Sequence, residues 1–151
     1  MKYELTEETK VIEGHTLYRI KATKNFSNIS KNDLGGFVEK VENLSQNNNC
    51  WVYGDAKVYG DAWVSGNAWV YGNAWVYGNA RVFGNAEVYE NAWVFENAEV
   101  CGDAEVYGNA EVCNGKITEN ISISNVIKNV NSKEKIIRED SINWSIEWNT
   151  N

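Results

Sequence analysis

The sequence contains no proline, a single histidine, and no run of apolar residues long enough to span a bilayer. A transmembrane helix needs about 20 consecutive apolar residues, and the segment Met1 to Glu8 lacks the apolar core of a signal peptide. The three cysteines have irregular spacings that match neither a disulfide framework nor a zinc motif. These absences predict a cytoplasmic protein with no membrane association and no bound metal.

A six-residue phrase repeats without interruption from Cys50 to Gly115, eleven times in all. Its typical form is Ala-Trp-Val-Tyr-Gly-Asn, as in Ala74 to Asn79. A fixed short period predicts a solenoid, in which each repeat buries its apolar side only against its neighbours. Alternation places alanine and valine inside and the aromatic residues outside, and the Gly-Asn pair makes the corner.

Three such corners close a triangular coil of 18 residues, with successive coils about 4.8 Å apart. We therefore predict an all-β fold, a single-stranded parallel β-helix of a little under four coils.

The segments on either side of the repeats are predicted to close the open ends of the solenoid, within one compact domain. Residues 1–49 form an N-terminal β cap, with two short strands around the Glu13-Gly14 turn and a third ending at Val38. The solenoid spans residues 50–125, with a slip of one residue after Gly115.

Residues 126–151 form a C-terminal capping segment. Residues 142–148 alternate as a strand does, whereas Ile137, Ser141, Trp144 and Trp148 would share one helical face. We favour a closing strand.

Two stretches resemble known families. The phrase Val-Tyr-Gly-Asn-Ala-Arg, from Val76 to Arg81, resembles the hexapeptide motif of left-handed parallel β-helices, which typifies the trimeric hexapeptide acyltransferase superfamily. Residues 35–38, 43–46 and 50–53 together resemble the start of YdcK-like hexapeptide-repeat proteins, which also occur in phages and prophages. The resemblance implies a left-handed coil, a trimer, and a phage or prophage origin. It supplies no catalytic residue.

Residues 18 apart stack on one face, so the outward positions are predicted to form three ladders. These are Trp51, Trp69, Glu87 and Glu105; then Lys57, Trp75, Trp93 and Glu111; then Trp63, Arg81 and Glu99. The solenoid is thus expected to be aromatic at its N-terminal end and acidic at its C-terminal end. The repeats hold only Lys57 and Arg81 against nine acids, so they carry the whole net charge of −7. The predicted self-association residues are Trp51, Tyr53, Trp63, Trp69, Tyr71, Trp75, Tyr77, Trp93 and Phe95. The predicted partner-binding acidic face consists of Glu87, Glu90, Glu96, Glu99, Asp103, Glu105 and Glu111.

Each surface has a structural and a functional interpretation. Stacked aromatic residues stiffen the ladder by about 0.2–1 kcal/mol per pair, or they form the interface of a trimer or dimer. The carboxylates keep the stack soluble and discourage edge-to-edge aggregation, or they engage a basic surface of a protein partner. Direct binding to nucleic acid is disfavoured, because phosphates call for lysine and arginine.

The sequence offers few side chains that could act as a catalytic nucleophile or base. His15 lies in the predicted cap, where we expect an exposed loop residue, and the repeats offer only Lys57 and one outward serine, Ser65. No nucleophile and base can be paired from these positions. We therefore predict a protein that is not an enzyme and needs no cofactor.

The favoured function is a phage-type binding protein, such as an inhibitor or anti-defence protein that occupies a basic surface of a host protein. The alternatives are a self-associating structural scaffold and a degenerate acyltransferase-like protein that holds a small ligand between subunits.

Overall fold

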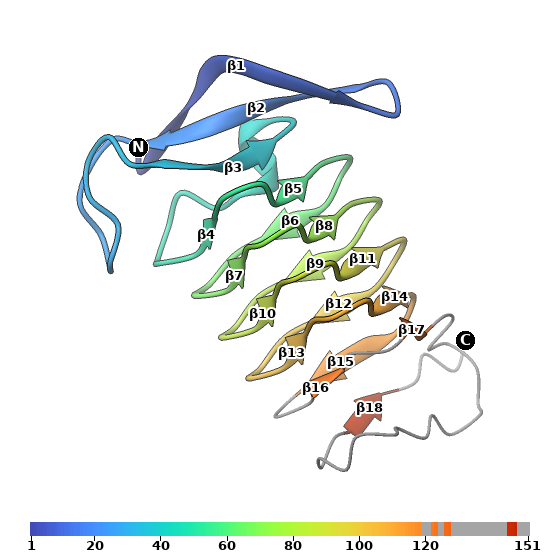
Figure 1. The fold of residues 1–151 in the computed structure, drawn as a ribbon. Coiled ribbons are helices and arrows are strands. Elements are labelled where there is room, and N and C mark those ends of the chain that lie inside the picture. The colour runs from blue at the N-terminus through green and yellow to red at the C-terminus, as the bar shows by residue number, and fades with distance from the viewer. Residues whose placement is uncertain (119–121, 124–125, 128–144, 148–151) are drawn as a thin grey trace.

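The computed structural model describes residues 1–118, 122–123, 126–127 and 145–147. The described residues form an all-β solenoid with an antiparallel hairpin lying across its N-terminal end (Figure 1).

The N-terminal elements are β1 (Tyr3–Ile12), β2 (His15–Ala22), β3 (Leu34–Val38) and one 3-10 turn, η1 (Val41–Asn43). The repeats supply β4 (Trp51–Val52), β5 (Lys57–Val58), β6 (Trp63–Val64), β7 (Trp69–Val70), β8 (Trp75–Val76), β9 (Arg81–Val82), β10 (Glu87–Val88), β11 (Trp93–Phe95), β12 (Glu99–Val100), β13 (Glu105–Val106) and β14 (Glu111–Cys113). The C-terminal strands are β15 (Lys116–Thr118), β16 (Ser122–Ile123), β17 (Val126–Ile127) and β18 (Ser145–Glu147).

Every third strand stacks in parallel on the strand one coil earlier, which produces three sheets. In one of them Trp51 pairs with Trp69, Trp69 with Glu87, and Glu87 with Glu105. Each residue therefore pairs with the one that stands three repeats of the phrase further along the chain, and the predicted coil length is confirmed. The left-handed sense of the coil, which only the resemblance implied, stays a prediction.

The interior consists almost entirely of the alanine and valine of each repeat. The repeat valines are fully buried, and so are the alanines, apart from Ala62 at 1% exposure. Period-two alternation in each short strand turns the first and third residues of the phrase inward. The predicted division into a small apolar interior and an aromatic exterior is therefore confirmed.

The corners use the left-handed backbone region, as their composition predicts. The glycines at the fifth place of the phrase, from Gly54 to Gly108, have φ between +59° and +68°, a region that costs glycine nothing sterically. A Cβ at Gly78 would also lie 2.7 Å from the backbone nitrogen of Glu96 in the next coil. Both the dihedral and the close packing of coils therefore demand glycine at this position.

The N-terminal hairpin matches the prediction in its turn but begins earlier. The β1 and β2 strands pair in antiparallel fashion around Glu13 and Gly14, whose φ values of 49° and 83° suit a tight hairpin turn. The β3 strand then pairs with β2 on one side and, in parallel, with β5 of the solenoid on the other. Leu44 bridges to Val64 in the same parallel sense. The parallel stacking thus starts before residue 50, where the sequence placed the boundary of the cap.

The C-terminal end keeps the stack but shortens its period. Glu99 pairs with Lys116 and Glu105 with Ser122, so each partner comes one position earlier in the chain than the regular period requires. This shortening confirms the slip after Gly115. The strand β18 pairs with β15 in antiparallel fashion, as a closing strand does. The residues of the alternative helical face, Ile137, Ser141, Trp144 and Trp148, lie outside the described residues.

Candidate interaction surface

The three sheets give the solenoid three outward faces, each named here by its side chains. The tyrosine face carries Trp69, Glu87 and Glu105 beside Tyr53, Tyr71, Tyr89 and Tyr107. The tryptophan face carries Lys57, Trp75, Trp93 and Glu111 beside Tyr59, Tyr77, Phe95 and Cys113. The mixed face carries Trp63, Arg81, Glu99 and Lys116 beside Ser65, Phe83 and Cys101.

On the tyrosine face the rings stack from coil to coil. The ring centroids of Tyr71 and Tyr89 are 4.8 Å apart with an interplanar angle of 2°, and those of Tyr89 and Tyr107 are 5.3 Å apart. The Tyr71 hydroxyl donates a hydrogen bond of 2.8 Å to Glu87, and the Tyr89 hydroxyl donates one of the same length to Glu105. Burial raises the pKa of both tyrosines above the ordinary value of a tyrosine, and these hydrogen bonds to carboxylates raise it further.

These tyrosine–glutamate bonds were missed at the sequence level. The expected like-charge neighbours Glu87 and Glu105 are indeed in register on adjacent coils, which by itself opposes folding. A hydroxyl from the preceding coil offsets part of this cost at each carboxylate. The signal in the sequence is a tyrosine that precedes each glutamate by almost one full coil. This spacing brings the two side chains together only once the coil is closed.

On the tryptophan face the stack is partly exposed. The rings of Trp75 and Trp93 lie 5.3 Å apart at 14°, and the Lys57 ammonium lies 5.9 Å from the Trp75 centroid. Trp93 is 36% exposed. Burial, together with the negative charges of Glu13 and Glu111, raises the pKa of Tyr77 to about 12.

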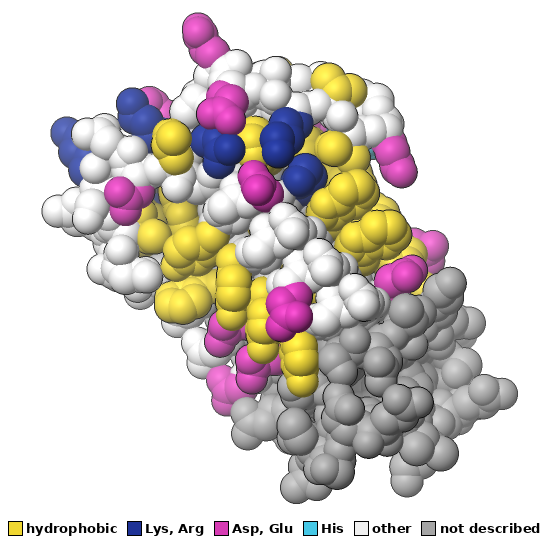
Figure 2. Space-filling model, viewed as in Figure 1, with side chains coloured by type: hydrophobic (Ala, Val, Ile, Leu, Met, Phe, Trp, Pro, Cys, Tyr) yellow, Lys and Arg dark blue, Asp and Glu magenta, His cyan; other side chains and the backbone are white. Residues whose placement is uncertain are grey.

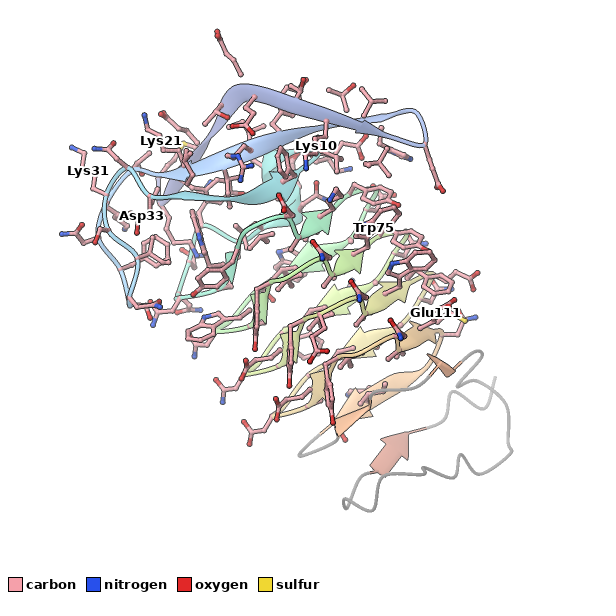
Figure 3. All side chains as sticks on the ribbon, in the orientation of Figure 1. Lys10, Lys21, Lys31, Asp33, Trp75 and Glu111 are labelled. Atoms are coloured by element: carbon pink, nitrogen blue, oxygen red, sulfur yellow. The ribbon has the colours of Figure 1, made fainter. Side chains whose placement is uncertain are left out.

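A shallow hollow of about 370 Å³ runs beside this stack, and Figure 3 shows Trp75 and Glu111 along the same side of the solenoid. Its lining is Asn73, Asn91, Asn109, Trp75, Trp93 and Glu111.

The mixed face balances its charges. Glu99 stands in register between Arg81 on the preceding coil and Lys116 on the following one. The Arg81 guanidinium lies 5.9 Å from the ring of Trp63, which is 44% exposed. Glu99 therefore adds little net negative potential on this side.

The predicted acidic residues are spread over all three faces and the corners. Glu87 and Glu105 lie on the tyrosine face, Glu111 on the tryptophan face and Glu99 on the mixed face. The others stand at corners: Glu90, Glu96 and Asp103. The amide of Asn114 donates to Glu96, and that of Asn85 donates to Asp103. The carboxylates therefore encircle the last coils, while the lysines and arginines seen in Figure 2 gather at the hairpin end.

The assignment of Trp51 to the self-association surface is wrong. Trp51 has no exposed surface, because the cap covers it, with Tyr3 and Phe26 in edge contact with its indole ring. The other predicted aromatic residues lie at the surface: Trp63 and Trp93 are exposed, and Tyr53, Trp69, Tyr71, Trp75, Tyr77 and Phe95 are half-buried.

His15 begins β2 and is half-buried, in contrast to the exposed loop residue expected. Its Nδ1 lies 2.8 Å from a carboxylate oxygen of Glu39, whose other oxygen accepts the backbone N–H of Gly60. Burial acts to raise the pKa of Glu39, but these hydrogen bonds and the charges of His15 and Lys40 outweigh it and lower the pKa. The pair joins the hairpin to the corner at Gly60.

Within the part of the chain that the structure describes, no three histidine, cysteine, aspartate or glutamate side chains are grouped to hold a metal ion. No helix among these residues is long and apolar enough to cross a membrane.

The comparisons with known proteins bear on the repeat. The family model described as the YdcK β-solenoid repeat matches residues 62–78 and 74–90, which include strands β6 to β10. A comparison with curated proteins found no match. The matched residues lie in the central coils described above, where each strand stacks in register on the strand of the preceding coil. Over these residues, the chain is similar to the YdcK β-solenoid repeat.

Proposed function

We propose that this protein is a non-enzymatic binding protein that uses the outer surface of its last coils to engage a basic surface of a protein partner. One observation carries the proposal: seven carboxylates encircle coils that contain no lysine or arginine between Val82 and Gly115. A rigid, closely stacked scaffold holds these charges at fixed spacing, so little order is lost on binding.

The acidic coils suit a partner whose own surface is made to bind nucleic acid. Such surfaces are rich in lysine and arginine. The acidic coils would compete with nucleic acid for these positive charges. We include in the proposal that the protein acts in the cytoplasm as a phage- or prophage-type inhibitor of a host protein, in an anti-defence role. Electrostatic matching of this kind accelerates association and weakens as salt rises.

The test is capture of partners by the immobilised protein from a host lysate at increasing salt, with identification by mass spectrometry. The matched variant replaces Glu87, Glu99, Glu105 and Glu111 by glutamine. We expect a basic partner that the native protein retains at low salt and that the variant does not retain. Equal retention by both proteins, or retention unaffected by salt, would exclude the proposal.

Self-association is a second candidate, favoured by one apolar patch. Met1, Val41 and Trp63 are all exposed, and they line a common hollow of about 300 Å³ at the N-terminal end of the mixed face. Exposed apolar clusters of this kind often mark interfaces. We infer a trimer or dimer through this patch, which light scattering at micromolar concentration tests. A monomer of unchanged mass in that measurement would remove this candidate.

A further inference from the structure

The three corners of the solenoid carry ladders of asparagine and aspartate, but only two of these ladders are internally bonded. At one corner the Asn79 amide donates to Asn97, and the Asn114 amide donates to Glu96. At a second corner Asn85 donates to Asp103, and Asn67 accepts the backbone N–H of Asn49.

The third ladder begins at Asp55, which pairs with Lys10, and continues with Asn73, Asn91 and Asn109. Among the described residues, the side-chain amides of these asparagines make no hydrogen bond to other protein groups, and all three asparagines are exposed. These amides lie between the tyrosine and tryptophan faces. They form one wall of the hollow of about 370 Å³ described above.

The opposite wall of the hollow is the tryptophan stack, which the Lys57 ammonium covers at one end. Trp75 has the Lys57 ammonium over its ring and stacks on Trp93 on its other side. The next residue in the ladder is Glu111, in register with Trp93 on the following coil. The hollow therefore offers an exposed indole, a carboxylate and three amides within one groove.

This combination suits a planar cation. A guanidinium stacks on an indole face, forms paired hydrogen bonds with a carboxylate, and donates further hydrogen bonds to amide oxygens. The protein already makes the first of these contacts internally, where Arg81 lies over Trp63. A lysine ammonium lacks the planar stacking surface, and a neutral group lacks the attraction to Glu111.

We propose that this hollow binds an arginine side chain from an extended segment of the protein partner, with the guanidinium stacked on Trp93 and paired with Glu111. The inference rests on the proposed function and specifies one contact of that interface. Its support is the charge complementarity of Glu111, the exposed Trp93 in the tryptophan stack and the asparagine amides that make no hydrogen bond to the described protein groups.

The test uses nitrogen-15-labelled protein and the probe N-acetyl-arginine amide, monitored through the indole N–H resonances. We expect saturable shifts at Trp75 and Trp93, and no saturable shift with the neutral citrulline analogue. Glu111→Gln should weaken binding of the probe by up to about fivefold, since an interaction of up to about 1 kcal/mol is lost. The matched change Glu4→Gln, at an exposed position of β1 in the hairpin, should leave the affinity unchanged. Unaltered indole spectra elsewhere verify that both variants fold.

Three results would overturn the assignment: no saturable shift at Trp93, equal binding of the citrulline analogue, or equal effects of the two glutamine variants. The proposed function is tested separately, by partner capture with the variant that carries all four glutamine substitutions. If that variant loses its partner while Glu111→Gln alone retains it fully, the arginine site is wrong and the acidic binding surface stands.

Discussion

At the scale of single residues, the corner positions show where the repeat tolerates change and where it does not. Glu90 and Glu96 occupy corner places that glycine holds in most other copies, with φ of 57° and 54°. A residue with a Cβ in this region is strained by about 1–2 kcal/mol. A Cβ at Gly72 would lie 2.9 Å from the backbone nitrogen of Glu90. The glutamates thus add charge to the last coils at a cost in backbone strain.

We predict that Glu90→Gly raises the free energy of unfolding by about 0.5–1 kcal/mol. Relief of strain exceeds the entropy that glycine adds to the unfolded chain. The neighbouring change Asn91→Gly, where φ is not positive, should lower stability instead. Urea denaturation followed by circular dichroism measures both values, and a loss of stability in Glu90→Gly would contradict the interpretation of strain.

At the scale of elements, the stacked ladders carry the stability that two-residue strands lack on their own. The strands β4 to β10 are each two residues long, so each forms few backbone hydrogen bonds with the strands on the neighbouring coils. Ring stacking adds contacts along the axis, as between Tyr59 and Tyr77 at 5.1 Å and Tyr77 and Phe95 at 5.2 Å. These contacts bury the tyrosine hydroxyls and disfavour their ionised forms.

We predict that the protein loses stability as the pH rises above about 10, the ordinary pKa of tyrosine. The folded state keeps protons on Tyr71, Tyr77 and Tyr89, whose pKa values are raised, while the unfolded chain releases them. Because the folded state then binds more protons, the free energy of unfolding falls with pH until these tyrosines ionise. Absorbance at 295 nm and urea denaturation at pH 8 to 12 test this.

The control for this titration is Glu87→Gln. It removes the carboxylate that accepts from Tyr71 and should lower the pKa of Tyr71 while leaving that of Tyr77 unchanged. Titration of all tyrosines near pH 10 in the folded protein would contradict the prediction.

At the scale of the whole molecule, the N-terminal hairpin seals the first coil. Trp51 is buried beneath Tyr3 and Phe26, and the buried Lys2 ammonium donates to the Cys50 carbonyl at 2.8 Å. Burial lowers the pKa of Lys2 below that of an exposed lysine. A Cβ at Gly35 would lie 2.5 Å from the Val52 carbonyl oxygen. The cap and the solenoid are therefore one packed body at this end.

We predict that Trp51→Ala costs about 3–5 kcal/mol of stability, the range found when large buried aromatic residues are truncated. Trp69→Ala, one coil further along the same ladder and half-buried, should cost clearly less. Hydrogen exchange of the β1 and β2 amides should accelerate in the first variant and stay close to native in the second. Equal costs for the two substitutions would show that the cap does not seal the coil.

Much of the fold follows from the sequence because the repeat is local and redundant. Six-residue periodicity, inward alanine and valine, and Gly-Asn corners each indicate the same coil, and eleven copies reinforce the signal. The hairpin turn at Glu13 and Gly14 is likewise a local signal. Much less of the candidate surface could be predicted. Sorting outward residues by the period of the coil placed Trp75, Trp93 and Glu111 in one ladder, but it could not show that a hollow lies beside them.

By itself the sequence determined the repeat, the interior, the corners and the distribution of charge along the chain, since these depend on residues a few positions apart. Only the tertiary structure decided that Trp51 is sealed by the cap and that Tyr71 and Tyr89 donate to glutamates on the next coil. Those outcomes depend on contacts between residues 16 to 48 positions apart, which form only when the chain closes on itself and the hairpin folds over its end.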